Sequence, residues 1–538
     1  MTTAEYITSI VSKTVPCYNN PEEALSLPYA VFYVEEKPQY DKDGVCGYID
    51  TVDLYIAAAT FTELQKLKTA VVGNLGNTVK IQSIKDTSDD AAQWYSEISI
   101  ERRYRTEVIQ EEDSEKEDIY SYGVIIDLSS TSPTLTRTGN PLLHKSLPVQ
   151  SQMRGCLLDD DGNVVKYLDA NDWTNETQDG SQGQVMIELP EFFYKFYTHA
   201  DGSYEVRISA RPLTGYHVRS KMYIGAYEAS LQRSTMKLCS VVNTTTDYRG
   251  GGNQSAWDGT YRSQLGMPVT LISLTNFREA ARRRKANSTE WNAYLYEAHK
   301  WLFWFFAIEY ATLNTQADYN AEPTSEGYRQ GGLGPGVTSW TGEAWNTYNN
   351  YYPIIPCGVT DKLGNGTGVV TYTIKNEEGV GFKSFSVPRY RGIENPFGHI
   401  WKFVDGINIR ISPTEENGGD GLSKIYVCKD PDKFSSTSYE GYTYIGNEAR
   451  ENGWVKTIVG GEHGDIIPTE IGGGSTRRYC DYHYTNIPTT ETLRAVLFSG
   501  AAVDGSGAGL VFANSDYAPS AASASVGSRL CFLPRNSA

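Results

Sequence analysis

The feature that most constrains the fold of this chain is a strongly acidic run, Glu107–Glu117, because it separates two parts with different sequence patterns. Its Glu-Glu-Asp-Ser-Glu-Lys-Glu stretch offers nothing apolar to bury, which is typical of a linker. A chain of 538 residues is also too long for a single hydrophobic core. We therefore predict one domain at residues 1–108, an acidic linker at 109–122 and a second domain at 123–538.

The first hundred residues have the periodicities of a small α+β domain. Apolar residues recur at helical spacing in Tyr6–Val11 and again in Leu64–Val71. Thr60 and Glu63 precede the second of these runs and form the capping-box pattern of a helix N-terminus. Strands are predicted after each helix, at 29–34, 51–56, 79–84 and 94–104. The expected order is helix, two strands, helix, two strands.

From Tyr122 onward the sequence consists mostly of short strand-like runs and long loops rich in Gly and Asn. Two helices are expected, one at 276–285 and one from about Ser288 to Leu313. The second is aromatic on more than one face, so it should be deeply buried. A long loop is expected at 315–353. The predicted fold class is therefore multidomain α+β, a small α-β-β-α-β-β domain followed by a large α+β domain with long loops.

Charge and cysteine content exclude several functions. The formal net charge is −17, and a nucleic-acid-binding surface needs a positive field, so DNA and RNA are not expected as partners. The longest apolar run, Trp301–Ala307, is too short to cross a bilayer, and we expect no membrane insertion. The first residues lack the pattern of a signal peptide, which predicts synthesis and folding in a cytoplasm. The eight cysteines form no CxxC pair and indicate neither a zinc module nor a disulfide framework.

Few runs suggest catalysis. Cys480-Asp481-Tyr482-His483 contains a thiol, a carboxylate and an imidazole, but a run this short in a strand-like segment favours packing over a nucleophile–base pair. Asp159–Asn163 resembles the start of a calcium loop, yet it lacks an acidic twelfth residue and is better explained as a hairpin turn. His399 and His463 lie in Gly-flanked turns. We expect no catalytic residue, no metal site and no cofactor, and therefore no enzyme.

The last forty residues have a different composition from the rest of the second part. Small and polar residues fill the interval from Phe498 to Phe532, between apolar runs at Leu493–Phe498 and Arg529–Leu533 that are typical of strands. Composition alone favours a long surface loop.

The frame around these small residues resembles a known family. Leu493–Phe498, Ala508–Leu510, Tyr517–Pro519 and Gly527–Phe532 are similar to the variable region of phage receptor-binding or tropism proteins that diversity-generating retroelements target. Upstream runs of the same family are similar to Leu147–Met153, Gly183–Pro190, Ser273–Arg278, Asn320–Tyr328 and Asn395–Trp401. The resemblance covers about residues 123–538. It implies a C-type-lectin-like fold related to formylglycine-generating enzymes. The active-site cysteine pair of those enzymes cannot be matched in this chain. Cys480 and Cys531 are the only cysteines that follow Cys428, and Cys531 lies within the apolar frame.

The resemblance implies a variable ligand-binding region at 498–532, which would bind a glycan or protein of the host cell surface. Its framework residues Leu497, Phe498, Leu510, Leu530 and Phe532 should fill the core. The residues expected to be exposed and to contact ligand are Ala501, Val503, Ser506, Val511, Ala513, Asn514, Ser515, Asp516, Tyr517, Ser523 and Ser525. Such small side chains make shallow contacts, so several copies should be needed for strong attachment.

The first domain resembles phage tail-completion proteins of the neck or tail terminator. Leu27–Val31, Asp43–Val45 and Gly47-Tyr48 carry this resemblance, together with the order of elements. It implies attachment to other virion proteins through residues 1–108 and a homo-oligomer, either a hexameric ring or a trimer. The expected location is the virion, at the neck, tail or head surface, after synthesis in the cytoplasm of the host bacterium. The alternative is a purely structural neck, collar or capsid decoration protein.

Overall fold

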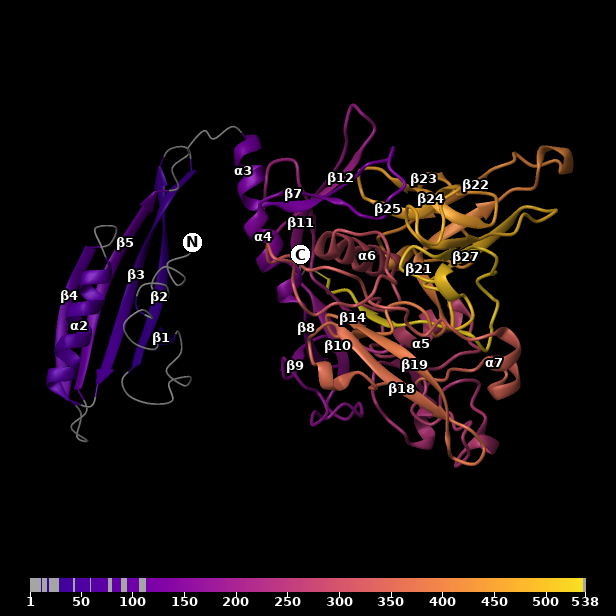
Figure 1. The fold of residues 1–538 in the computed structure, drawn as a ribbon, viewed down its shortest axis with the longest axis horizontal. Helices are drawn as coiled ribbons and strands as arrows, with labels where there is room; N and C mark the ends of the chain where they lie inside the picture. Colours follow the sequence, from indigo (N-terminus) through magenta and orange to yellow (C-terminus); the bar gives the residue numbers. More distant parts are fainter. Residues whose placement is uncertain are drawn as a thin grey trace. The chain divides into compact units, whose positions relative to one another are not determined.

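The computed structural model describes Val11 and residues 17–18, 29–41, 44–58, 60–75, 80–88, 94–105 and 113–535. The chain divides into two compact units, Met1–Glu115 and Lys116–Ala538, and the division falls within the acidic segment (Figure 1). Both units combine helices with sheets, so the protein is a multidomain α+β protein. Part of the expected linker is regular structure, because Asp113–Tyr120 forms helix α3. In the second unit, Glu117 of this helix accepts a hydrogen bond from Tyr216, which fixes its last turn.

The first unit is built around a five-stranded sheet in the order β1-β2-β3-β5-β4. Its elements are β1 (Cys17–Tyr18), β2 (Tyr29–Asp41), β3 (Gly44–Ala58), α2 (Phe61–Leu75), β4 (Lys80–Ser88) and β5 (Trp94–Arg105). The alternation of Val52, Leu54 and Ile56 places these side chains in the core, as predicted. The Thr60 hydroxyl accepts a hydrogen bond from the Glu63 backbone N–H at 3.2 Å and caps α2. Of the helix expected at Tyr6–Val11, only Val11 lies within the described residues, where it is helical and buried.

The second unit contains three larger sheets. One has the order β17-β30-β14-β10-β8-β9, another β13-β11-β12-β6-β7, and a nine-stranded sheet β23-β22-β21-β27-β28-β26-β24-β25, with β29 pairing beside β21. Two smaller sheets pair β15 with β16 and join β18, β19 and β20. The strands up to β17 are β6 (Tyr122–Ile126), β7 (Thr136–Gly139), β8 (Arg154–Leu158), β9 (Val164–Tyr167), β10 (Gln184–Leu189), β11 (Phe192–Thr198), β12 (Tyr204–Ser209), β13 (His217–Arg219), β14 (Met222–Gly225), β15 (Ser230–Gln232), β16 (Lys237–Cys239) and β17 (Trp291–Ala293).

The remaining strands form the three-stranded sheet, the whole nine-stranded sheet and the last strand of the six-stranded sheet. They are β18 (Gly368–Lys375), β19 (Gly381–Tyr390), β20 (Ile393–Glu394), β21 (Trp401–Ile411), β22 (Ser423–Val427), β23 (Thr443–Asn447), β24 (Gly453–Gly460), β25 (Asp465–Ile471), β26 (Tyr482–Tyr484), β27 (Thr492–Phe498), β28 (Ala513–Asn514), β29 (Val526–Gly527) and β30 (Leu530–Phe532). The helices of this unit are α4 (Pro141–Ser146), α5 (Leu274–Arg282), α6 (Tyr296–Tyr310) and α7 (Gly342–Asn349).

Helix α6 lies in the middle of the second unit (Figure 1), and every residue in it except Glu297 is buried. The aromatic residues of β11 pack on it, with the rings of Phe192 and Tyr194 each 4.6 Å from the Trp301 ring. The expectation of a deeply buried helix is confirmed. Its predicted start is wrong, because Trp291–Ala293 is strand β17 and pairs with β30. The Trp291 ring packs on Phe532 at 4.8 Å, a contact made far along the chain that overrides the helical spacing.

The loop expected at 315–353 contains helix α7, which begins directly after its N-cap residue, Thr341. The Thr341 hydroxyl accepts a hydrogen bond from the Ala344 backbone N–H at 3.2 Å. The hairpin turn predicted at Asp159–Asn163 is confirmed, since it joins the antiparallel strands β8 and β9. Among the residues that the structure describes, no cluster of three or more His, Cys, Asp or Glu side chains could hold a metal ion.

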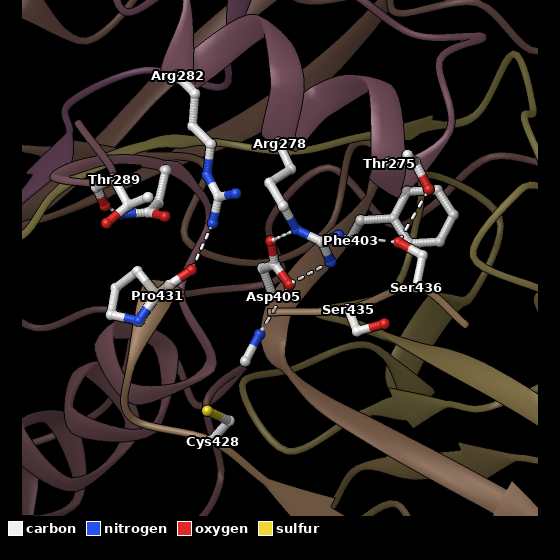
Figure 2. A network of polar contacts seen from close by, with 12 residues as sticks. Thr275, Arg278, Arg282, Thr289, Phe403, Asp405, Cys428, Pro431, Ser435 and Ser436 are labelled. Atoms are coloured by element: carbon white, nitrogen blue, oxygen red, sulfur yellow. Dashed lines mark hydrogen bonds and ion pairs between the residues drawn. The ribbon is translucent and has the colours of Figure 1, made fainter. Parts of the chain in front are cut away.

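A buried ion pair joins helix α5 to strand β21 (Figure 2). The Arg278 guanidinium donates to both carboxylate oxygens of Asp405, at 2.6 and 2.8 Å, and to the Ser436 hydroxyl at 3.0 Å. Asp405 also accepts the backbone N–H of Gly406 at 2.9 Å. One turn along the helix, Arg282 donates to the Pro431 carbonyl at 2.5 Å. These contacts tie the helix and the 428–436 loop to the sheet that carries the C-terminal segment.

Candidate binding surface at the C-terminal segment

The C-terminal segment, residues 498–532, is anchored in sheets at both ends. Strand β27 leads into it and pairs with β21, with Phe498 opposite Lys402. Strand β29 pairs in parallel with the same strand β21, and β30 pairs with both β14 and β17. The framework residues predicted to fill the core are all buried: Leu497, Phe498, Leu510, Leu530 and Phe532. A buried histidine, His299 of α6, contacts the Leu510 carbonyl at 2.7 Å and holds the middle of the segment against this helix.

The expected exposure is wrong for five of the eleven predicted contact residues. Ala501, Val511, Ala513, Asn514 and Ser515 are buried. The reason is strand pairing, because Ala513 and Asn514 form β28 between β26 and β27 and so lie inside the nine-stranded sheet. Of the other six, Val503, Ser506 and Asp516 are exposed, and Tyr517, Ser523 and Ser525 are half-buried. The available surface is therefore a turn at 503–506 and a second stretch at 516–525.

Two buried carboxyl groups hold the interior of the segment. Asp481 accepts the Val511 backbone N–H at 2.6 Å, and Glu448 accepts the Ser515 hydroxyl at 2.8 Å. Burial raises the pKa of Asp481 well above the usual range of a carboxyl group, and it raises the pKa of Glu448 to about 8. A Cβ on Gly509 would lie 2.0 Å from a carboxyl oxygen of Asp481, so any larger residue there would displace this buried side chain. The buried half of the segment is therefore a fixed scaffold.

The exposed turn at 503–506 is held by contacts of its backbone and of the Asp504 side chain, and these contacts do not use the side chains of Val503 and Ser506. The Gly505 backbone N–H donates to the Thr338 carbonyl at 2.9 Å, and the Gln316 side-chain amide donates to the Gly505 carbonyl at 2.8 Å. Asp504 closes the turn by accepting the Ala501 backbone N–H at 2.7 Å, and burial raises its pKa to about 6. Val503 and Ser506 can therefore change without altering the path of the chain.

An aromatic strip lies beside this turn. It consists of Trp454, Tyr482 and Tyr484, with the Trp454 and Tyr482 rings 5.5 Å apart and the two tyrosine rings 5.1 Å apart. A Cβ on Gly507 would lie 3.1 Å from the Tyr482 Cβ and 4.0 Å from the Trp454 ring, so the strip directly adjoins the exposed turn. Tyr484 is 36% exposed and rests on buried Phe512 at 5.4 Å. Half-exposed aromatic rings with a polar end are typical of binding surfaces.

The sequence interpretation missed this strip, although the sequence carries a signal for it. Tyr482 and Tyr484 alternate with His483 in one strand, so the two tyrosines share the outer face and the histidine points inward. His483 is fully buried, and burial lowers its pKa to about 4. Its ring nitrogens face the carbonyl oxygens of Ala513 and Ala449. The imidazole therefore supports strand packing, as expected for the Cys480–His483 run.

Two cysteines, Cys480 and Cys531, lie near or within the segment. Cys480 and Cys531 are both free and buried, and burial raises the pKa of each thiol to about 12. Cys531 lies in β30, where it pairs with Ile224 and Asn292 of the neighbouring strands. A thiol with so high a pKa is almost wholly protonated at neutral pH and is a poor nucleophile.

His399 also has a structural role. Its Nδ1 lies 2.5 Å from Glu228, whose other carboxylate oxygen is 2.9 Å from the Lys402 ammonium. Its Nε2 accepts the backbone N–H of Ile354 at 3.0 Å, so Nδ1 carries the proton. The His399 carbonyl accepts the Ala502 backbone N–H at 3.1 Å, which fixes the start of the C-terminal segment. Burial alone would raise the pKa of Glu228, but the nearby Lys402 and His399 lower it to about 2.

None of the helices in the described ranges is long and apolar enough to cross a membrane.

No family model matches the chain, and no curated protein matches it in sequence. Several solved structures show similarity, among them the following three. PvdO from Pseudomonas aeruginosa is 10% identical, with 66% of this chain and 97% of PvdO covered and a TM-score of 0.28.

The U1 variant of a major tropism determinant is also 10% identical, with 64% of this chain and 72% of that chain covered and a TM-score of 0.17. A chain from the virion of a native gene transfer agent particle is 16% identical. It covers 18% of this chain and 84% of its own length, with a TM-score of 0.16.

Proposed function

We propose that this chain is a phage virion protein whose second unit displays a receptor-binding surface of C-type-lectin-like fold. The observation that carries the proposal is the division of residues 498–532 into a buried frame and two exposed stretches of small and polar residues. The frame is held by sheets, buried acids and backbone contacts, so the exposed positions can be exchanged without loss of the fold. The contact positions that we retain are Val503, Ser506, Asp516, Tyr517, Ser523 and Ser525.

The aromatic strip of Trp454, Tyr482 and Tyr484 supplies a contact area that small residues cannot supply. A tyrosine or tryptophan buries a large area on contact at little cost in conformational entropy, while serine and glycine adapt their hydrogen bonds. A constant aromatic platform beside a variable turn therefore suits attachment to a glycan or protein of the host cell surface. The variable positions would select among ligands, and the strip would provide a shared part of the binding energy.

The first unit would attach the protein to other virion proteins, as its resemblance to tail-completion proteins implies. A homo-oligomer, either a six-fold ring or a trimer, would then present several copies of the second unit at the neck, tail or head surface. We propose binding without catalysis. The support is that the Cys480 thiol and the His483 imidazole face different carbonyl oxygens and that burial holds both in their neutral forms.

The proposal is tested with two surface variants of the full chain. Val503→Arg combined with Ser506→Arg changes the variable turn, and Tyr484→Ala shortens the aromatic strip. We expect both to reduce binding of the purified protein to host cells, measured by flow cytometry, by about tenfold or more. Val165→Arg is the matched control, because Val165 is exposed on β9, outside the proposed surface.

Unchanged cell binding by both surface variants would contradict the receptor-binding role. Particles that carry these variants and still adsorb normally would favour the purely structural role in the virion. Conversely, loss of adsorption by particles that assemble with normal amounts of the variant protein would support the display of a receptor-binding surface.

A further inference from the structure

A groove outside residues 498–532 crosses the second unit between three segments. These are the loop at 257–262, helix α7 and the tip of the β18–β19 hairpin at 375–382. Two adjoining cavities, of about 530 and 690 Å³, share Tyr261, Arg262, Asn376 and Glu377 among their lining residues. They form one groove of the size that binds small-molecule or saccharide ligands.

One wall of the groove is aromatic. The rings of Tyr348 and Phe382 are stacked with their planes 3° apart and their centroids 6.0 Å apart. Tyr261 packs edge-on against Tyr348 at 5.2 Å. The Arg262 guanidinium lies over the Trp257 ring at 5.6 Å and over the Tyr261 ring at 5.2 Å. Phe382 is 55% exposed, although an apolar ring of this size is more stable when covered.

The aromatic wall is fixed before any ligand arrives. The Tyr348 hydroxyl donates to the Lys375 carbonyl at 2.9 Å, which joins α7 to the hairpin. Arg262 Nε donates to the Tyr261 hydroxyl at 2.9 Å, which joins the two residues of the loop. The Trp340 ring supports Tyr348 from behind at 5.3 Å. A wall held in this way loses little conformational entropy on binding.

The rim of the groove is rich in hydrogen-bond acceptors. Glu343, Glu377 and Glu378 line it and are exposed, and Asn376 adds an amide. Within the described part of the chain, neither these carboxylates nor Arg262 takes part in an ion pair. Carboxylates accept hydrogen bonds and cannot donate them, so they match ligands with many hydroxyl or ammonium donors.

We propose that this groove binds a neutral or basic oligosaccharide. A sugar ring has a C–H face that packs on an aromatic ring and a rim of hydroxyl donors that match carboxylate acceptors. Three carboxylates against the Arg262 guanidinium and the Lys375 ammonium leave the groove with a net negative charge, which disfavours sugars with carboxylate or sulfate groups.

The saccharide site does not depend on the function proposed above, because the groove contains no residue of 498–532. The two surfaces are nevertheless neighbours. The Trp340 backbone N–H donates to the Ala502 carbonyl at 2.8 Å, while the Trp340 ring supports the groove. The groove would keep one saccharide preference constant while the adjoining segment changes.

The experiment uses the full chain on an array of neutral oligosaccharides (of glucose, galactose, mannose and N-acetylglucosamine), basic ones (of glucosamine) and acidic ones (sialylated or uronic-acid-containing). Neutral or basic sugars that bind are then measured by isothermal titration. We expect Phe382→Ala to weaken this binding at least about fivefold. Val380→Ala is the matched control, because Val380 is 60% exposed in the same hairpin but does not line the groove.

Saccharide binding that is lost in Phe382→Ala, kept in Val380→Ala and kept in the Val503→Arg/Ser506→Arg variant supports the site. Glu377→Gln should also admit acidic sugars that the wild-type protein rejects. The proposal is overturned if no neutral or basic sugar binds, if only acidic sugars bind, or if Phe382→Ala binds as well as Val380→Ala. Loss of sugar binding in the Val503/Ser506 variant alone would assign the sugar to the C-terminal segment instead.

Discussion

At the scale of single residues, the buried acid Glu448 has the clearest measurable consequence. It accepts hydrogen bonds from Ser515 and Thr485, at 2.8 and 3.5 Å. His483 Nε2 lies 3.8 Å from its other carboxyl oxygen, and burial lowers the pKa of this imidazole to about 4, so that it brings no positive charge at neutral pH. Burial raises the pKa of Glu448 from the ordinary 4.5 to about 8. The folded protein therefore holds Glu448 protonated at neutral pH, whereas the unfolded chain releases the proton above pH 4.5.

This difference predicts the sign of a pH effect. Because the folded pKa is raised, the contribution of Glu448 to stability is fully present below about pH 4.5 and is lost as the pH rises through 8. Glu448→Gln keeps the shape but cannot ionise. We measure the free energy of unfolding of both proteins by thermal unfolding from pH 5 to 9. We expect the stability of the variant relative to the wild type to increase as the pH rises, by a few kcal/mol at pH 9. Parallel curves for the two proteins would contradict the buried, protonated state.

The ion pair between Arg278 and Asp405 supports a second prediction at this scale. Both side chains are buried, with exposed fractions of 8% and 2%. Removal of the guanidinium leaves a buried carboxylate without its partner, which costs about 3–5 kcal/mol. Arg278→Ala should therefore lower the free energy of unfolding by that amount in urea denaturation.

Arg283, the C-cap residue of the same helix, is the matched control for Arg278. Its side chain is half exposed, and its nearest acid, Glu279, is 3.9 Å away. Arg283→Ala should change the free energy of unfolding by less than about 0.5 kcal/mol. Equal stability of the two variants would mean that the pair seen in Figure 2 contributes nothing to the fold.

At the scale of elements, the C-terminal segment predicts where substitutions are tolerated. Arginine at Val503 or Ser506 should change the free energy of unfolding by about 0.5 kcal/mol or less, because both side chains face solvent. Tyrosine at Ala513 or Ser515 should destabilise the protein by about 1–3 kcal/mol or more, because both are fully buried, Ala513 in β28 and Ser515 directly after it. Urea denaturation of the four variants measures the difference. A buried position that accepts tyrosine without loss would show that β28 is not a fixed strand.

Sequence patterns predicted the strongly periodic elements well. The alternation in β3, the Thr60 cap of α2 and the burial of α6 all depend on residues close together in the sequence. The predicted start of α6 was wrong. Trp291 has helical spacing to Tyr294 and Leu295, yet it lies in a strand that pairs with β30 near the end of the chain. A spacing rule contains no information about a partner so distant.

The same limit explains the predicted contact residues. Small side chains such as Ala513 and Ser515 suit solvent and tight packing equally well, so composition could not distinguish the two. Whether such a residue is buried depends on its contact partner. Ser515 donates a hydrogen bond to Glu448, and Ala513 pairs with Phe498 in the neighbouring strand. The framework residues were predictable because Leu, Phe and Cys in a strand-like run rarely face water. The aromatic strip could have been found from the alternation of Tyr482 and Tyr484.

At the scale of the whole molecule, the division into two units matters most. Each unit has its own sheets and its own buried residues. A polypeptide of residues 116–538 should therefore fold by itself and unfold cooperatively. Its thermal unfolding should reproduce the transition that Arg278→Ala shifts in the full chain. Aggregation or noncooperative unfolding of this polypeptide would show that the second unit requires the first.

Separate folding allows a test of how the two units divide attachment between them. The exposed positions of the C-terminal segment are small, so one copy should bind a cell surface weakly, and an oligomer should gain strength by simultaneous contacts. We expect the full chain to bind host cells about 100-fold more tightly than residues 116–538 alone. Fusion of residues 116–538 to an unrelated trimeric coiled coil should restore most of the difference, because it restores several copies without restoring the first unit. If the fused and unfused polypeptides bind equally, and both bind more weakly than the full chain, the first unit contributes contacts of its own. If the unfused polypeptide already binds as tightly as the full chain, one copy is sufficient for attachment and the oligomer has another purpose.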